Sequence, residues 1–350
     1  MKRKGVTIYD IAKEAKVSTA TISRVLNGKG NVSVKKREEI MNIVNRHNFV
    51  PDARAKSLRK THTKTMGIIT SDLRNPFFSN LLIECEKLAN EAGYTIFSCD
   101  SLEQMDMEVK LLKRLDRQKV DAIIQIGGSS DHEKDNEVYR ECITSIARRI
   151  PIVTTGYAIC NNCYSVMTNE ANAMELVLEY LINLGHKDIA FIGGNDTIRS
   201  TAEKRKQYMK FLDNRKIPFN ALYVLDTEYT KEGGYAGMKT LLELEKIPSS
   251  IIVINEMAAV GAIKAIKEYG LRIPMDISVV SFDNTYISEA ITPALTSVGC
   301  DYADFAKKLV GTTLKVLEGE KAEDISYVDS LFVIRDSCMK YNMILENKYE

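Results

Sequence analysis

The stretch VTIYDIAKEAKVSTATISRVLNG, residues 6–28, has the pattern of two short helices joined by a tight turn. Thr7 precedes the first helix, in which apolar residues recur at helical spacing up to Ala15. Ser18 is placed to cap the second helix, and Asn27-Gly28 is a common helix stop. The spacing therefore predicts helices over about 8–15 and 19–26.

A third helix is predicted from Val34 to about His47, and its inward face is formed by Val34, Ile40, Ile43 and Val44. Three such helices make a helix-turn-helix domain. Small and polar side chains let its second helix enter a major groove and reach base edges or phosphates: Thr19, Ala20, Ser23 and Arg24. The alternative is a plain three-helix domain whose polar face meets only solvent.

The charge distribution favours nucleic-acid binding over that alternative. The whole chain has 350 residues and a formal net charge of +1. Residues 1–64, however, contain 16 Lys/Arg and 5 Asp/Glu, a net charge of +11, and the remainder contains 32 and 42, a net charge of −10. Phosphate neutralisation needs such a concentration of positive charge.

From Thr65 onward, apolar runs alternate with amphipathic helical patterns. Runs near 66–70, 95–99, 122–126, 152–154, 189–192, 222–225, 251–254, 277–282 and 330–334 predict strands. This alternation is typical of parallel sheets covered by helices. The helical pattern lapses near 160–167 and 285–298, where we expect the chain to cross between two doubly wound lobes. A ligand cleft is then expected between the lobes, at the carboxyl ends of their strands.

The first sixty residues also resemble the start of regulators of the LacI/GalR (lactose-repressor) family. The resemblance rests on Val6-Thr7-Ile8-Tyr9-Asp10-Ile11-Ala12, Val17-Ser18, Thr21-Ile22-Ser23-Arg24-Val25-Leu26-Asn27 and Val50-Pro51. It implies a DNA-binding domain over 1–50, a hinge segment over 51–64 and an effector-binding and dimerisation domain over 65–350. We expect the body to be periplasmic-binding-protein-like, with one lobe at about 65–164 and 297–327 and the other at about 165–296 and 328–350.

Residues 52–60 contain four basic residues and one large apolar side chain, Leu58. A nine-residue helix is marginal in water, so it would order only on binding. In the family, the matching hinge helices of a dimer enter the minor groove, where the matching Leu opens a base step. The alternative is a flexible linker whose Leu58 packs on the next domain. The full set expected at DNA is Thr7, Tyr9, Ser18, Thr19, Ala20, Thr21, Ser23, Arg24, Asn27, Ala55 and Leu58.

The resemblance continues through the body. It is carried by Asn75-Pro76-Phe77-Phe78, Gly185-His186, Ile192-Gly193-Gly194, Ile277-Ser278-Val279-Val280, Phe282-Asp283, Leu295-Thr296 and Ile334-Arg335-Asp336-Ser337. It implies a repressor that binds a near-palindromic operator as a homodimer, with a sugar or related metabolite between its lobes. The expected effector contacts are Phe77, Phe78, Thr168, Lys204, Tyr229, Asn255, Glu256 and Asp283.

Several of these positions depart from the family pattern. The chain has Thr168-Asn169 where the family usually has Asp-Asn, Lys204 where it has Arg, and Asn255-Glu256 where it has Asn-Asp. Lys keeps the charge of Arg but loses its bidentate fork. Arg205 is one position further on, so it should point about 100° away on the helix. An ordinary hexose pose is therefore in question, and the effector could be larger, modified or not a sugar.

Other functional classes have little support in the sequence. Neither a G-x-x-x-x-G-K-[ST] loop nor a G-x-S-x-G elbow occurs, so an enzyme fused to a DNA-binding head is the weaker alternative. The four His lack metal-ligand spacing, and we expect no metal or cofactor. Seven scattered Cys, including Cys160 and Cys163 in one C-x-x-C, indicate reduced thiols of a cytoplasmic protein without a membrane span.

The direction of regulation stays open at this point. An effector could release the protein from DNA, or it could act as a co-repressor and promote binding. A cleft that has lost its ligand and answers to a protein partner is a third possibility, which the departures at Thr168, Lys204 and Glu256 support.

Overall fold

The computed structural model describes residues 8–26, 32–47, 62–133 and 136–341. The chain divides into two compact units, Met1–Thr63 and Lys64–Glu350, and each is described by itself. Of the expected DNA contacts, Thr7, Asn27, Ala55 and Leu58 lie outside the described residues, and so does nearly all of the predicted hinge segment.

The first unit contains α1 (Ile8–Glu14), α2 (Thr19–Leu26) and α3 (Val34–Arg46). Their common core contains Ile11, Ala12, Ala15, Ile22, Val25, Ile40, Ile43 and Val44. Val34 was expected in this core, but it is 74% exposed because it opens the first turn of α3. Ser18 Oγ accepts the Thr21 amide at 3.2 Å, which confirms the predicted cap of α2.

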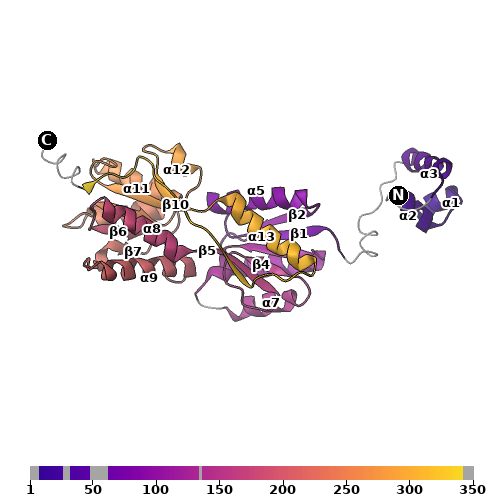
Figure 1. The fold of residues 1–350 in the computed structure, drawn as a ribbon, viewed down its shortest axis with the longest axis horizontal. Helices are drawn as coiled ribbons and strands as arrows, with labels where there is room; N and C mark the ends of the chain where they lie inside the picture. The colour runs from indigo at the N-terminus through magenta and orange to yellow at the C-terminus, as the bar shows by residue number, and fades with distance from the viewer. Residues whose placement is uncertain (1–7, 27–31, 48–61, 134–135, 342–350) are drawn as a thin grey trace. The chain divides into compact units, whose positions relative to one another are not determined.

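The second unit has two six-stranded sheets in two lobes (Figure 1). The N-lobe sheet is parallel throughout and has the order β11-β5-β4-β3-β1-β2. Its strands are β1 (Thr65–Thr70), β2 (Thr95–Asp100), β3 (Ala122–Ile126), β4 (Ile152–Thr154), β5 (Cys163–Thr168) and β11 (Ile325–Val328). Its helices are α5 (Pro76–Glu91), α6 (Met105–Gln118), α7 (Glu137–Ala147) and α13 (Tyr302–Leu317).

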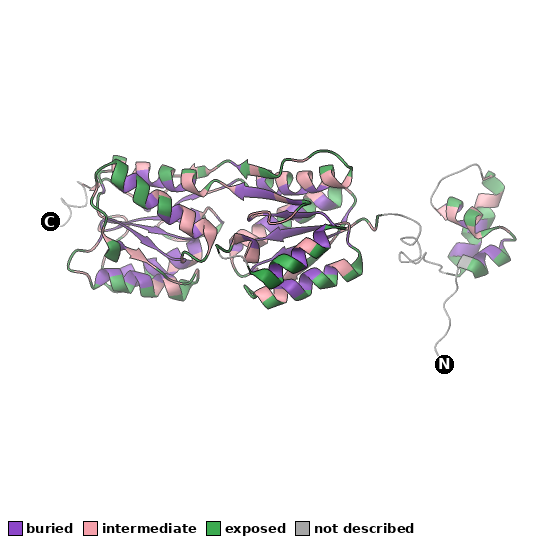
Figure 2. Cartoon of the chain, turned by 90° about the horizontal axis from the view of Figure 1, so that it is seen from below, coloured by how far each residue is buried: buried purple, intermediate pink, exposed green. Residues whose placement is uncertain are grey.

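Successive residues of the N-lobe strands pack into different cores, as the pleat of a strand requires. Ile68 and Ile124 join the core beneath α5 and α13, whereas Ile69 and Ile123 join the core beneath α6 and α7. The sheet is therefore covered on both faces, and its inner strands β1, β3 and β4 are buried between helices (Figure 2), whereas the edge strand β2 has no buried residue. Burial on both faces explains the continuous apolar runs of the sequence.

The C-lobe sheet has the order β12-β10-β9-β8-β6-β7, in which only the β10–β12 pair is antiparallel. Its strands are β6 (Ile189–Ile192), β7 (Val224–Leu225), β8 (Ser250–Val253), β9 (Ser278–Asp283), β10 (Thr296–Gly299) and β12 (Leu331–Val333). Its helices are α8 (Glu170–Asn183), α9 (Arg199–Asn214), α10 (Lys231–Leu242), α11 (Glu256–Glu268) and the short α12 (Ile287–Ala290). Short 3-10 helices occupy Gly128–Asp131 and Ala221–Tyr223.

The crossings between lobes lie a few residues beyond their expected places. Residues 165–168 belong to β5 of the N-lobe, and residues 297–299 belong to β10 of the C-lobe. The boundaries expected at 164/165 and 296/297 therefore move to the ends of those strands, after Thr168 and Gly299. A third crossing lies between Val328 and Leu331. The polar residues of β5 and β10 conceal their strand character in the sequence.

Leu309 links α13 to the N-lobe core and is fully buried. We predict that Leu309→Ala lowers the free energy of unfolding by about 2–5 kcal/mol, because the removed methyl groups leave a cavity. Urea denaturation of the whole chain measures this loss. Leu222→Ala is the matched control, since Leu222 is 62% exposed and should change stability by less than about 0.5 kcal/mol. Equal effects of the two substitutions would contradict the role of Leu309.

Candidate functional site

The strands of both lobes end at a cavity of about 1070 Å³ that lies between the lobes. Its N-lobe wall follows the carboxyl ends of β1 to β5, and its C-lobe wall follows those of β6 to β10. Binding at the carboxyl ends of parallel strands is the rule for doubly wound sheets. The volume suits a small organic molecule.

Seven of the eight predicted effector residues line this cavity: Phe77, Phe78, Thr168, Lys204, Tyr229, Asn255 and Asp283. The two Phe rings contact each other edge to face, with centroids 5.3 Å apart. Phe77 packs further against Tyr302 and Phe305, whereas Phe78 covers Gly127, where an added Cβ would lie 2.6 Å from the ring. Gly127 also has a φ of +74°, a conformation that favours glycine. Both the backbone angle and the position of the Phe78 ring therefore require glycine at this turn.

Glu256 was predicted to contact the effector, but the structure does not place it in the cavity lining. Its side chain is 1% exposed and lies behind the cavity wall rather than in it. The carboxylate accepts hydrogen bonds from the hydroxyls of Ser288 and Ser297, both at 2.8 Å, and from the Thr285 amide at 3.3 Å. Burial raises the pKa of Glu256. The extra methylene of Glu takes the carboxylate into this group of hydroxyls, where it stabilises the loop after β9.

Asp283 ends β9 with its backbone in a left-handed conformation, φ +88°, and Asn284 follows at φ +49°. Such conformations cost about 1–3 kcal/mol for residues other than glycine and concentrate at functional sites. Tyr302 donates to the Asp283 carbonyl at 2.8 Å, and a Cβ on Gly299 would lie 2.3 Å from that oxygen. The backbone is thus held in place. Among the described residues, no hydrogen-bond donor reaches the Asp283 carboxylate.

Lys204 is 6% exposed, and its ammonium pairs with Glu170 at 2.5 Å. Thr168 donates to the other oxygen of Glu170 at 2.5 Å, so the two predicted residues share one carboxylate. The Lys204 ammonium also lies 4.9 Å from the centroid of the Phe282 ring. Lys204 therefore pairs with a carboxylate of the protein itself, where the family residue Arg could offer two parallel N–H groups to a ligand.

Arg205 does not line the cavity. Its guanidinium donates to the carbonyls of Gly193 and Gly194 and pairs with Asp226 at 2.5 Å. These contacts hold the loops after β6 and β7. Arg205 is therefore a structural residue beneath the C-lobe wall.

Tyr229 and Asn255 line the cavity, but their polar atoms already have partners within the protein. The Tyr229 hydroxyl and the Thr201 hydroxyl are 2.5 Å apart. Asn255 caps α11 by accepting the Ala258 amide, and its own amide donates to the Tyr229 carbonyl at 3.0 Å. Burial raises the pKa of Tyr229. Both residues therefore shape the C-lobe wall.

The two lobes also touch directly beside the cavity. Asp131 of the N-lobe accepts the Ser200 hydroxyl at 2.6 Å and the Ser200 amide at 3.3 Å from α9. Tyr157 donates to Glu203 at 2.6 Å. Burial raises the pKa of Asp131 to about 6. The sequence reasoning missed these residues, although Asp131 and Tyr157 follow β3 and β4 at the edge where a ligand was expected.

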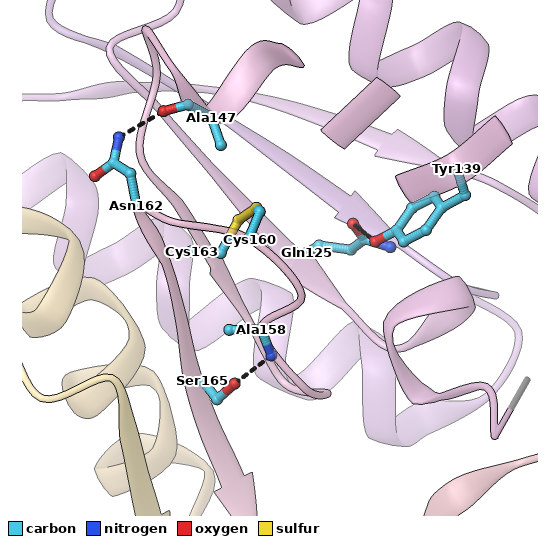
Figure 3. The surroundings of a disulfide bond; sticks show 8 residues. All are labelled: Gln125, Tyr139, Ala147, Ala158, Cys160, Asn162, Cys163 and Ser165. Carbon is cyan, nitrogen blue, oxygen red and sulfur yellow. Dashed lines mark hydrogen bonds between the residues drawn. A yellow bond between two sulfur atoms is a disulfide. The ribbon is translucent and has the colours of Figure 1, made fainter. Parts of the chain in front are cut away.

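The C-x-x-C pair corrects another expectation. Cys160 and Cys163 form a disulfide with Cα atoms 5.4 Å apart, so the prediction of reduced thiols is wrong for this pair (Figure 3). The β4–β5 loop turns back on itself here, and the Cys163 amide donates to the Cys160 carbonyl at 3.2 Å. Asn162 anchors the turn by donating to the Ala147 carbonyl at 2.8 Å. The other five cysteines are free.

In the first unit, Tyr9, Ser18, Ala20 and Arg24 are exposed, whereas Thr19, Thr21 and Ser23 are half-buried. The second helix thus presents Ala20 and Arg24 outward while Ile22 and Val25 hold it to the core. The α1–α3 packing is tied by Glu14, which accepts from Arg46 at 3.1 Å. No helix within the described residues has the length and apolar character to cross a bilayer.

The geometry agrees with comparisons of sequence and structure. Residues 7–52 match the bacterial regulatory proteins of the lacI family, and residues 178–338 match a periplasmic binding protein-like domain. The chain is 33% identical to catabolite control protein A of Priestia megaterium over 84% of this chain and 87% of that one. It is 31% identical to the ribose operon repressor of Haemophilus influenzae over 88% and 91%.

The fold of the lac repressor bound to operator and an anti-inducer is similar, with a TM-score of 0.84 at 24% identity over 96% of this chain and 100% of that one. The chain belongs to the lacI family of bacterial transcription regulators, which bind DNA through the N-terminal helix-turn-helix domain.

The raised pKa of Asp131 predicts that the stability of the protein depends on pH, and this tests the burial of Asp131 at the contact between the lobes. A carboxyl whose pKa rises from 3.8 to about 6 on folding binds protons more readily in the folded state, so its ionisation lowers stability as pH rises through that range. We compare the free energy of unfolding of Asp131→Asn with that of the parent protein. We predict that the difference, variant minus parent, increases from pH 4 to pH 7 by up to about 3 kcal/mol. Urea denaturation at the two pH values measures this. A difference that is independent of pH would contradict the assignment.

Proposed function

We propose that this protein represses transcription by binding a near-palindromic operator as a homodimer in the cytoplasm. A two-fold protein recognises a two-fold DNA site. The observation that carries the proposal is the joint presence of a helix-turn-helix unit with net positive charge and a second unit with a cavity between its two lobes. The lac repressor dimer bound to operator has the same fold.

In this proposal, α2 enters the major groove. Arg24 and Ala20 are exposed on its outer face and would approach base edges, together with Thr19 and Ser23. Thr7, Tyr9, Ser18, Thr21 and Asn27 would position phosphates. These contacts set the register of the helix on the duplex, and the exposed Arg24 adds sequence discrimination.

The hinge segment is proposed to order on operator DNA, where Ala55 and Leu58 of each protomer would enter the minor groove. The Leu58 side chain would separate a central base step, at a cost of a few kcal/mol that a bent and better-wrapped DNA offsets. Because the step is opened only in the specific complex, this contact would distinguish the operator from other DNA.

A small molecule in the cavity is proposed to control operator affinity. It would change how the lobes close on each other, and its contacts would be the seven predicted residues that line the cavity: Phe77, Phe78, Thr168, Lys204, Tyr229, Asn255 and Asp283. The shift in DNA affinity is limited by the difference in ligand affinity between the two states. We propose a regulatory rather than a catalytic role for the cavity, since the relatives of this chain are transcription regulators.

Arg24→Ala should weaken operator binding by about 1–3 kcal/mol if Arg24 reads a base, and should relax the preference at that position. An operator is first selected from random duplexes, and affinities are then measured by fluorescence anisotropy at several salt concentrations. Arg117→Ala is the control, because Arg117 is exposed on α6 of the body. Unchanged operator affinity in Arg24→Ala would exclude base reading.

Leu58→Ala should weaken operator binding more than nonspecific binding, because only the specific complex contains the opened base step. The same anisotropy titrations on operator and on scrambled DNA measure the two losses. If the losses are equal, Leu58 does not act as a wedge.

A further inference from the structure

The lining of the cavity is strongly acidic. It contains three Lys or Arg side chains, Arg74, Lys204 and Lys231. It contains ten carboxylates: Asp72, Glu103, Glu108, Asp131, Glu170, Glu203, Asp226, Glu228, Glu232 and Asp283. The formal charge of the lining is therefore −7. His132 adds no charge near neutral pH, because burial lowers its pKa below 6.5.

The basic side chains of the lining are already engaged. Arg74 pairs with Asp72 at 2.8 Å, Lys204 with Glu170 at 2.5 Å and Lys231 with Glu232 at 4.0 Å. Asp226 pairs with Arg205, which does not itself line the cavity.

Six carboxylates are left without a basic partner among the described residues: Glu103, Glu108, Asp131, Glu203, Glu228 and Asp283. Some of them have neutral donors, such as Ser129 for Glu108, Ser200 for Asp131 and Tyr157 for Glu203. Asp283 has none in the described part of the chain, although its backbone is held by Tyr302. A carboxylate kept in place without a donor is an open position for a ligand group.

Carboxylates gathered around one cavity repel one another, and the buried ones among them are poorly hydrated. The pKa values of Glu103, Glu108 and Asp283 are raised, in each case chiefly by burial. For Asp283 the charge of Glu256 behind the wall adds to the effect of burial, whereas the positive charge of Lys204 opposes it. A positive charge brought into the cavity would relieve this repulsion, whereas a neutral molecule would leave it.

We propose that the effector of this cleft is a small organic cation that carries protonated amine groups. The deep carboxylate of Asp283 and the rim carboxylate of Glu103 accept its ammonium groups, and the rings of Phe78 and Tyr229 cover its carbon skeleton. Aromatic faces also attract cations. The inference rests on the proposed function, since it names the ligand class for the same cavity.

The test compares cations with matched neutral molecules on the full chain. The probes are glucosamine and spermidine as cations, and glucose and N-acetylglucosamine as neutral counterparts, measured by isothermal titration calorimetry. At least one cation should bind about tenfold or more tightly than both neutral sugars, and its affinity should fall between low and high salt. Tighter binding of a neutral sugar overturns the proposal, as does a lack of binding by both cations at millimolar concentration.

Substitutions separate the cavity from nonspecific binding to an acidic surface. Asp283→Asn should weaken the cation about tenfold, because a charge-assisted hydrogen bond is lost. Glu103→Gln should give a smaller loss, about two- to fivefold, because the rim is hydrated. Glu245→Gln is the control, since Glu245 is exposed outside the cavity. If Glu245→Gln costs as much as the two cavity variants, binding is at the surface and the proposal is wrong.

A parallel titration of operator DNA separates this inference from the proposed function. If a cation binds the cavity but leaves DNA affinity unchanged, the ligand class stands and effector control fails. If a neutral sugar binds and changes DNA affinity while the cations do not, effector control stands and the ligand class is overturned.

Discussion

Parallel pairing within each sheet is the constraint on which the rest of this structure depends. All strands of a parallel sheet end at the same edge, so the loops after them converge. In this chain the loops of both lobes converge on one cavity, because the backbone crosses between the lobes after Thr168, Gly299 and Val328. The N-lobe sheet takes a strand from near the end of the chain, Ile325–Val328, and this ties the two lobes together.

The positions around the cavity show how a family site can be kept while its electrostatics change. Lys204 keeps the positive charge, but Glu170 and Thr168 engage it within the protein. Glu256 keeps a carboxylate, but its longer side chain carries the group behind the wall. The Asp283 carboxylate has no hydrogen-bond donor within the part of the chain that the structure describes. The lining nevertheless has ten carboxylates against three Lys or Arg side chains, and this imbalance is the basis for the ligand class that we propose.

Contacts between the lobes lie next to the same cavity. The Asp131–Ser200 and Tyr157–Glu203 hydrogen bonds join the N-lobe to α9, the helix that also carries Lys204. The loop that presents Tyr157 continues into the Cys160–Cys163 disulfide. Ligand binding, lobe contact and loop conformation therefore involve adjacent residues, which is the arrangement that control of DNA affinity by lobe closure requires.

The family resemblance supplied the seven predicted residues that line the cavity, whereas the residue pattern by itself determined the helix-turn-helix unit and the alternation of strands and helices. These are local properties: Ser18 caps α2, and buried strands are continuous apolar runs. Only the tertiary structure decided which residues face the cavity together. The direction of Glu256, the pairing of Lys204 and the disulfide depend on neighbours far away in the sequence, as does the strand character of residues 163–168 and 296–299. Residue spacing predicts which face of a helix or strand a side chain occupies, but it does not predict which distant residue that side chain contacts.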